Sequence, residues 1–166
     1  MSRWAGLVVT LGLVWAPEVA AESSKWQEHR VAGIVFSAPA SAEVTTESVD
    51  TDVTVVAVTH RKEVLLITLY RGKSAPSAKR ALAAHGEEFE RRVSKDGRMR
   101  MGRGSLRVLG RKRTYRTIDH GAEDARQRMS LFAIKLTKTT LVAAWTAPSN
   151  RGRPIAPKLL QGLSME

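Results

Sequence analysis

The sequence predicts an α+β fold in which an antiparallel β-sheet is flanked by two helices. Pairs of runs rich in Val, Ile, Leu and Thr are separated by short polar breaks, as in β-hairpins. Residues 78–93 repeat apolar side chains at three- and four-residue steps, which is the period of an amphipathic helix. A shorter helical pattern follows at residues 155–163. Two runs of strands, each followed by a helix (β-β-β-α, twice), are typical of an α+β sandwich.

The clearest local signal is the pair of runs at residues 52–59 and 63–70. Both carry apolar side chains at odd and at even positions, so both faces of these strands are expected to be covered. A second hairpin with the same property is predicted at residues 127–136 and 140–147. We therefore expect these strands to lie inside the sheet, with helices covering it.

Weaker strand signals lie before the first hairpin, at residues 31–37 and 42–49. The first is expected to end at Pro39, because proline removes a ladder donor. The long helix is expected to begin with Ser74 as its N-cap and to end near Gly97.

Between the long helix and the second hairpin, strands are predicted at residues 105–109 and 113–118, with residues 110–112 as a turn or bulge. Gly102 and Gly104 are expected to form a bulge. They also begin a pattern like a dinucleotide fingerprint, but a strand and not a helix follows, so no cofactor is predicted there.

Positive charge is concentrated at residues 91–116, which hold eleven Lys or Arg and one acid in a chain of net charge +11. So dense a charge indicates an anionic partner or a counter-charged surface, because like charges repel one another. Part of the run also has a structural explanation, since bases late in a helix suit its dipole. The predicted anion- or partner-binding residues are Arg98, Arg100, Arg103, Arg107, Arg111, Lys112, Arg113 and Arg116.

Met99 and Met101 alternate with Arg98 and Arg100. An extended segment would place the thioethers on one face and the guanidinium groups on the other. The alternative is that the methionines belong to the core and that the arginines form an ordinary solvated face.

The N-terminal residues 1–21 have the three parts of a secretory signal peptide. Arg3 precedes an apolar run, Pro17 interrupts it, and small residues end at Ala21, after which cleavage is expected. The run is too short to cross a membrane, which takes about 20 helical residues. An uncleaved helix is the alternative. The sequence thus predicts a periplasmic or secreted protein.

The chain has no cysteine. Disulfides, cysteine zinc sites, a thiol nucleophile and a lipidated cysteine are therefore excluded, and the fold must be held by its core alone. Residues 22–30 are predicted to be a loosely held polar lead-in, and residues 31–166 to form a single domain.

A family resemblance accompanies this order of elements. The strand ending in Phe36-Ser37-Ala38-Pro39, the hairpin, the long helix and the closing blocks at residues 140–148 and 157–164 resemble PsbP/Mog1-like domains, which include DcrB-like exported bacterial proteins. The resemblance implies a sheet flanked by helices and a binding or accessory role in place of catalysis. It implies no shared catalytic set, and the arginine-rich run lies outside the family pattern.

The sequence therefore predicts an exported, non-enzymatic domain of the cell envelope. Its basic surface would bind a lipid head group, lipopolysaccharide or an acidic protein, with peripheral contact to a membrane. No catalytic residue, cofactor or metal site is predicted, since the four histidines have no second ligand at close spacing.

Three alternatives to this role remain. A hydrolase would use Asp119 and His120, although no nucleophile elbow is present. A nucleic-acid-binding protein would use the basic run, in which only Tyr115 offers a ring for stacking. A ligand carrier would hold a small molecule between sheet and helix.

Overall fold

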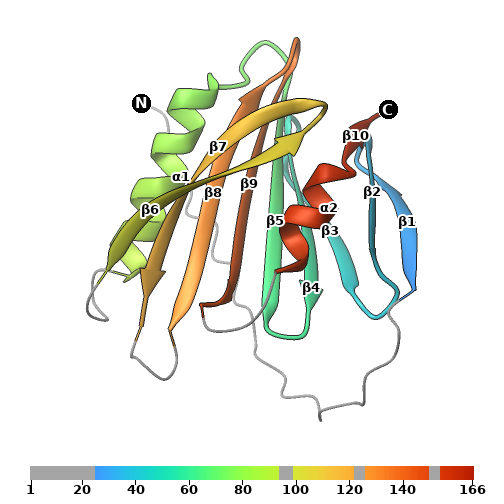
Figure 1. The fold of residues 1–166 in the computed structure, drawn as a ribbon. Coiled ribbons are helices and arrows are strands. Elements are labelled where there is room, and N and C mark those ends of the chain that lie inside the picture. Colours follow the sequence, from blue (N-terminus) through green and yellow to red (C-terminus); the bar gives the residue numbers. More distant parts are fainter. Residues whose placement is uncertain (1–24, 94–98, 122–125, 150–153) are drawn as a thin grey trace.

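The computed structural model describes residues 25–93, 99–121, 126–149 and 154–166 (Figure 1). The predicted leader at residues 1–21, the predicted helix end near Gly97, and Arg98 lie outside these ranges. Within them, no helix is both long enough and apolar enough to span a membrane.

Ten strands and two helices make up the described part of the chain. In order they are β1 (Trp26–Val31), β2 (Ile34–Pro39), β3 (Glu43–Asp50), β4 (Val53–His60), β5 (Glu63–Arg71), α1 (Ala78–Val93), β6 (Arg100–Val108), β7 (Arg111–His120), β8 (Gln127–Lys135), β9 (Thr139–Pro148), α2 (Ile155–Gln161) and β10 (Ser164–Met165).

The strands form two antiparallel sheets. The large sheet has the order β3-β4-β5-β9-β8-β7-β6, and the small sheet has the order β1-β2-β10. The predicted α+β class, with an antiparallel sheet and two helices, is confirmed. So are both predicted hairpins, β4–β5 and β8–β9, and they meet where β5 pairs with β9 at the centre of the large sheet. Long apolar runs lie here because interior strands are buried on both faces.

The two faces of the large sheet bury separate cores (Figure 1). Helix α1 packs on β8 and β9, and this smaller core contains Ala81, Met129, Leu131 and Val142. Helix α2 contacts β2, β5 and β6 on the opposite side. The larger core lies there, so the cover of that face includes strands as well as the helix that the sequence predicts.

Two polar contacts attach the outer elements to the large sheet. The carboxylate of Glu63 accepts a hydrogen bond from the backbone N–H of Ile155 at 2.7 Å, at the first turn of α2. The guanidinium group of Arg71 donates to the carbonyl oxygen of Ala32 and, at 2.9 Å, to the hydroxyl of Thr54. The small sheet is thereby tied to β4 and β5.

The N-terminal strand differs from the prediction. Residues 26–30, expected to belong to a loose lead-in, form β1 together with Val31, and the single strand expected at residues 31–37 is divided between β1 and β2. The division falls at Ala32 and Gly33, which both have positive φ (52° and 70°). A two-residue turn of this hand matches the twist of a tight hairpin, so the apolar run folds back on itself.

The start of α1 also differs. Ser77 caps this helix, since its hydroxyl accepts a hydrogen bond from the N–H of Arg80 at 3.2 Å. Ser74, the predicted N-cap, instead donates to Asp52 at 3.2 Å. The predicted apolar face is present, with Leu82, His85 and Phe89 half-buried towards the sheet.

The turn between β6 and β7 lies one residue earlier than predicted, at Leu109 and Gly110, which both have positive φ. Arg111 and Lys112 are therefore strand residues. Gly102 does not form a bulge, because β6 and β7 pair in regular register through it and through Gly104. A Cβ atom on Gly104 would lie 2.2 Å from the ring of Tyr115, so the glycine makes room for that ring.

This arrangement predicts a specific cost for Gly104→Ala. The ring of Tyr115, whose centroid lies 5.0 Å from that of Trp145, would have to move away from the core. We expect a loss of about 1–3 kcal/mol in the free energy of unfolding, measured by urea denaturation. In a Tyr115→Ala background the same change should cost nothing or stabilise the strand, because alanine suits a strand better than glycine. An equal loss in both backgrounds would contradict this explanation.

Candidate functional site

The basic residues lie on a two-stranded ribbon, residues 100–120, which we call the β6–β7 ribbon. Strand β6 is the edge of the large sheet. Strand β7 pairs with β8 only from Arg116↔Leu131 to His120↔Gln127, so residues 111–115 have left β8. Figure 1 shows the ribbon bending over the α2 side of the sheet, and β6 contacts α2.

The register of the ribbon decides which way each base points. Side chains alternate between the two faces of a strand. The ring of Tyr115 packs at a tilt against that of Trp145, and Leu106 and Val108 belong to the larger core, so their face of the ribbon is the inner one. Residues Arg103, Arg107, Lys112 and Arg116 lie on the opposite, outer face.

These four bases form two like-charged cross-strand pairs, which we call the outer ladder. Arg103 lies opposite Arg116, and Arg107 lies opposite Lys112. Directly opposed Cβ atoms are about 4.5–5.5 Å apart, and like charges there are destabilising. The outer ladder therefore holds like charges opposite each other at a cost in stability. A bound anionic partner would offset this cost.

Only one base of the outer ladder has an acidic partner in the described part of the chain. Arg116 is half-buried beside α1 and forms an ion pair with Glu90 at 3.4 Å. Arg103, Arg107 and Lys112 are exposed and form no ion pair with any described carboxylate. Three unneutralised cations thus share one surface.

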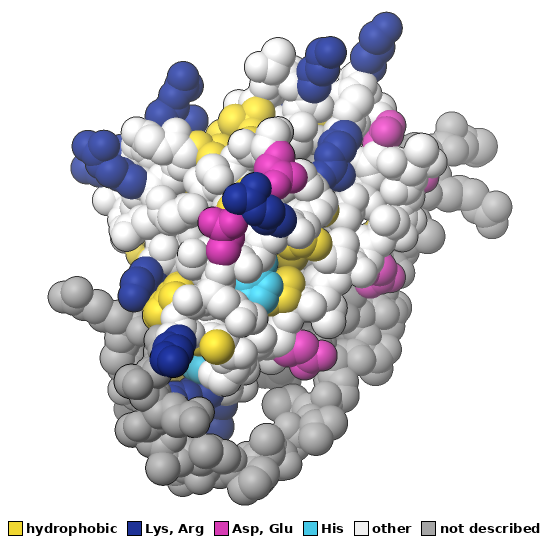
Figure 2. Space-filling view, turned by 90° about the vertical axis from the view of Figure 1, so that its right-hand side faces the viewer, with side chains coloured by type: hydrophobic (Ala, Val, Ile, Leu, Met, Phe, Trp, Pro, Cys, Tyr) yellow, Lys and Arg dark blue, Asp and Glu magenta, His cyan; other side chains and the backbone are white. Residues whose placement is uncertain are grey.

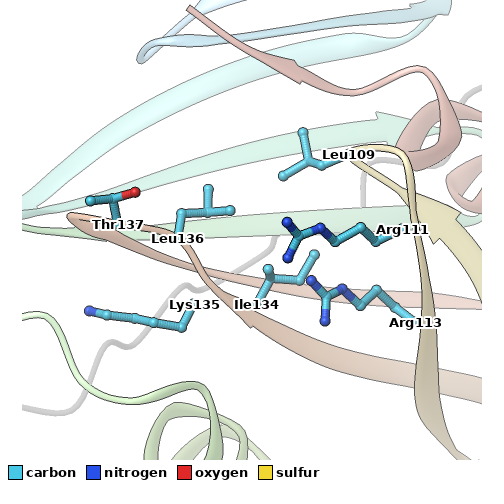
Figure 3. Close-up of a pocket in the computed structure, with 7 residues that line it drawn as sticks. All are labelled: Leu109, Arg111, Arg113, Ile134, Lys135, Leu136 and Thr137. Atoms are coloured by element: carbon cyan, nitrogen blue, oxygen red, sulfur yellow. The ribbon is translucent and has the colours of Figure 1, made fainter.

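The other predicted site residues that the structure describes lie on the inner face, while Arg98 is outside the described residues. Arg100 is opposite Asp119. Arg111 and Arg113 follow the turn and line a cavity between the first half of β7 and the end of β8 (Figure 3). The structure therefore divides the predicted binding residues between two faces, and it does not bring all of them together.

Met99 and Met101 are exposed, which contradicts the alternative that they belong to the core. Met101 has 60% of its surface exposed and Met99 has 39%. Met101 shares the outer face with Arg103, while Arg100 is on the inner face. The expected separation of thioethers from guanidinium groups thus holds only between Met101 and Arg100.

The side of the molecule that carries the small sheet has a different charge pattern. Figure 2 shows basic side chains lying singly there, with acidic side chains between them. Arg30, for example, pairs with Glu28 at 2.8 Å and with Glu166 at 3.3 Å. Neutralising pairs of this kind are absent among the described residues around Arg103, Arg107 and Lys112, which makes the outer ladder distinctive.

Asp119 and His120 do not form a catalytic pair. They are neighbours in β7 and point to opposite faces of the sheet. The Asp119 carboxylate accepts two hydrogen bonds from Arg128, at 2.7 and 2.9 Å, and these hold the pKa of Asp119 below its usual value. His120 packs edge-on against Phe89, with 5.3 Å between ring centroids. The alternative of a hydrolase built on these two residues has no support in this geometry.

The histidines lie apart from one another. His29 stacks on Phe36 in the small sheet, and burial lowers the pKa of His60 at the end of β4. No group of three or more potential metal ligands occurs in the ranges that the structure describes.

A partly buried hydrogen bond joins α1 to the sheet. The Tyr70 hydroxyl lies 2.8 Å from Nε2 of His85, and the two rings meet edge-on. Burial lowers the pKa of His85 and raises the pKa of Tyr70, so both side chains are neutral near pH 7. This contact between α1 and β5 fixes the helix on the sheet.

No local pattern in the sequence indicates the cavity beside Arg111 and Arg113. Its other lining residues are Leu109, Ile134, Lys135, Leu136 and Thr137. This space is open because β7 pairs with β8 over five residues and then separates from it. Strand pairing is a long-range property, so a local sequence pattern does not indicate where the pairing ends. A second hollow, of about 380 Å³, lies between α2 and the small sheet and is lined by Trp26 and Lys158.

Comparison with known proteins identifies the fold. No protein-family model matches the chain, and no curated protein matches it in sequence. The structure is similar to that of cyanobacterial PsbP (CyanoP) from Synechocystis sp. PCC 6803, with a TM-score of 0.53 and 11% identity over 93% of this chain and 100% of that one. The chain therefore has a PsbP/Mog1-like fold, as its element order predicts.

A second similar structure is a crystal structure of a protein from Bacteroides thetaiotaomicron VPI-5482. Its TM-score is 0.52 at 11% identity, over 87% of this chain. The match spans 49% of that protein, so this chain corresponds to about half of it. At such identity both likenesses concern the fold alone.

The half-buried His85 predicts a pH dependence of stability. Its pKa in the folded protein lies below the ordinary value of 6.5, so its contribution to stability is complete above about pH 6.5 and is lost progressively as the pH falls. Urea denaturation at pH 7 and pH 5.5 should show a smaller loss of unfolding free energy for His85→Gln than for the wild type. Equal losses in the two proteins would refute this assignment.

Proposed function

We propose that the protein is an exported, non-enzymatic binding domain whose outer ladder docks on anionic lipid head groups of the cell envelope. The observation that carries the proposal is the pairing of Arg103 with Arg116 and of Arg107 with Lys112 on one face of an edge ribbon. An anionic surface would relieve the repulsion within these pairs. Each base near an anionic membrane surface contributes about 1 kcal/mol to binding.

A lipid surface suits this face better than an acidic protein does. Met101 lies beside Arg103 on the same face and has 60% of its surface exposed. An exposed apolar side chain next to cations favours a membrane interface. There the apolar side chain is buried among acyl chains, and the cations meet phosphate groups. Arginine is also well suited to phosphate through its planar fork of donors.

Nucleic acid is a weaker candidate for the same charges. Single-strand binders stack bases on exposed rings. Tyr115, the one aromatic residue among the bases, is turned inward onto Trp145. The outer face of the described ribbon thus offers charge without a stacking platform.

The compartment rests on the N-terminal pattern. The arrangement of Arg3, an apolar run, Pro17 and Ala21 is that of a secretory leader, and the absence of cysteine is compatible with an exported domain held by its core. Cleavage after Ala21 would leave the whole basic run in the mature chain. Mass spectrometry of the exported protein would measure this cleavage.

Docking is tested with vesicles. We expect the protein to sediment with vesicles containing 30 mol% phosphatidylglycerol, chosen as an anionic lipid, and not with phosphatidylcholine vesicles. The bound fraction should fall steeply between low and high salt. Changing Arg103, Arg107 and Lys112 together to Gln should weaken binding at least about tenfold, since three head-group contacts are lost.

The matched control removes the same charge elsewhere. Lys62, Lys73 and Lys138 are exposed bases outside the ribbon, and their joint change to Gln should leave vesicle binding near the wild-type value. Equal binding to both kinds of vesicle, or equal losses in the two triple variants, would overturn the proposal. Binding to lipopolysaccharide or to an acidic protein without binding to the anionic vesicles would also overturn it.

A further inference from the structure

The cavity between β7 and β8 has the features of a small-molecule site. It has a volume of about 340 Å³, which falls within the range of roughly 300–1,000 Å³ that is usual for ligand pockets. It exists because β7 pairs with β8 only as far as Arg116, while β8 continues to Lys135. The pocket therefore lies between two well-formed strands.

Two arginines supply its polar side. Figure 3 shows Arg111 and Arg113 side by side, both extending from β7 towards Ile134 and Leu136. The Nε atom of Arg113 is buried and has no hydrogen-bond partner among the described residues. Because this atom has almost no accessible surface, a bound oxyanion would reach Arg113 through its terminal guanidinium nitrogens, which carry its other N–H donors.

The rest of the lining is mostly apolar. Leu109, Ile134 and Leu136 face the arginines, and none of the seven lining residues is acidic. Lys135 extends away from the arginines in Figure 3, and its ammonium group donates to the carbonyl oxygen of Ala75 at 3.3 Å. The pocket thus combines two adjacent guanidinium groups with an aliphatic wall.

We infer that this pocket binds an amphiphilic anion, a carboxylate or phosphate that carries a short apolar chain. The head group accepts hydrogen bonds from the terminal guanidinium nitrogens of Arg111 and Arg113, as arginine forks do with oxyanions. The chain lies along Leu109, Ile134 and Leu136, where its burial removes apolar surface from water.

This site is separate from the outer ladder. Arg111 and Arg113 are on the inner face of β7, whereas Lys112 between them is on the outer face. The inference therefore goes beyond the proposed docking on lipid head groups. Either of the two functions can fail while the other holds.

The test uses decanoate and decyl phosphate as probes, below their micelle concentrations, with decanol and inorganic phosphate as partial probes. We expect saturable binding of at least one amphiphilic anion by calorimetry, and at least about tenfold weaker binding of the alcohol and of phosphate alone. Arg113→Gln and Arg111→Gln should each weaken binding by about tenfold or more, as expected for a lost charged hydrogen bond. The tighter of the two anions identifies the head group.

Lys112→Gln is the matched control, because it removes one charge from the same strand on the other face. It should leave decanoate binding unchanged while weakening vesicle binding. Backbone amide NMR shifts on titration should centre on residues 109–113 and 134–137, which locates the site without any variant. Decanol binding as tight as decanoate binding, equal effects of Arg113→Gln and Lys112→Gln, or shifts centred elsewhere would overturn the inference.

Discussion

The alternation of side chains along the β6–β7 ribbon is the constraint on which both candidate sites depend. The ribbon can cover the larger core only if Leu106, Val108 and Tyr115 point inward, where Tyr115 meets Trp145. Because side chains alternate between the two faces of a strand, the inward direction of these three residues sets the face of every other residue in the ribbon. Arg103, Arg107 and Lys112 must point outward, and Arg111 and Arg113 must lie along the inner edge. Core packing thus decides where the charges of this protein are displayed.

The same charges also serve the sheet. Strand β6 is an edge strand, and its unpaired backbone groups could pair with another chain. Exposed bases along an edge discourage such pairing. This role accounts for some positive charge on β6. It does not account for Arg113, which is turned inward with its Nε atom buried. The position of Arg113 therefore distinguishes a pocket from simple protection of an edge.

Much of the fold follows from local patterns, whereas the candidate sites follow only in part. The β4–β5 and β8–β9 hairpins are readable because their strands are apolar on both faces and flank short polar turns. The two-residue turns at Ala32 and Leu109 are not, because both residues are apolar and rarely adopt positive φ. The predicted turn at residues 110–112 includes Arg111, whereas the turn lies at Leu109 and Gly110. For this reason the sequence does not indicate that Arg111 lies on the inner face of a strand. Gly104 looked like a bulge because the ring that occupies its space belongs to the partner strand.

The fold class, the absence of disulfides and the concentration of positive charge between residues 91 and 116 can all be read from the amino-acid sequence. These are properties of composition and of short-range periodicity. Only the tertiary structure decided that the basic residues divide into an outer ladder and an inner pair, and that β7 leaves β8 at Arg116 to open a cavity. The physical reason is that strand register and the point where two strands separate are set by packing against Trp145 and α2, which are distant along the chain from the arginines.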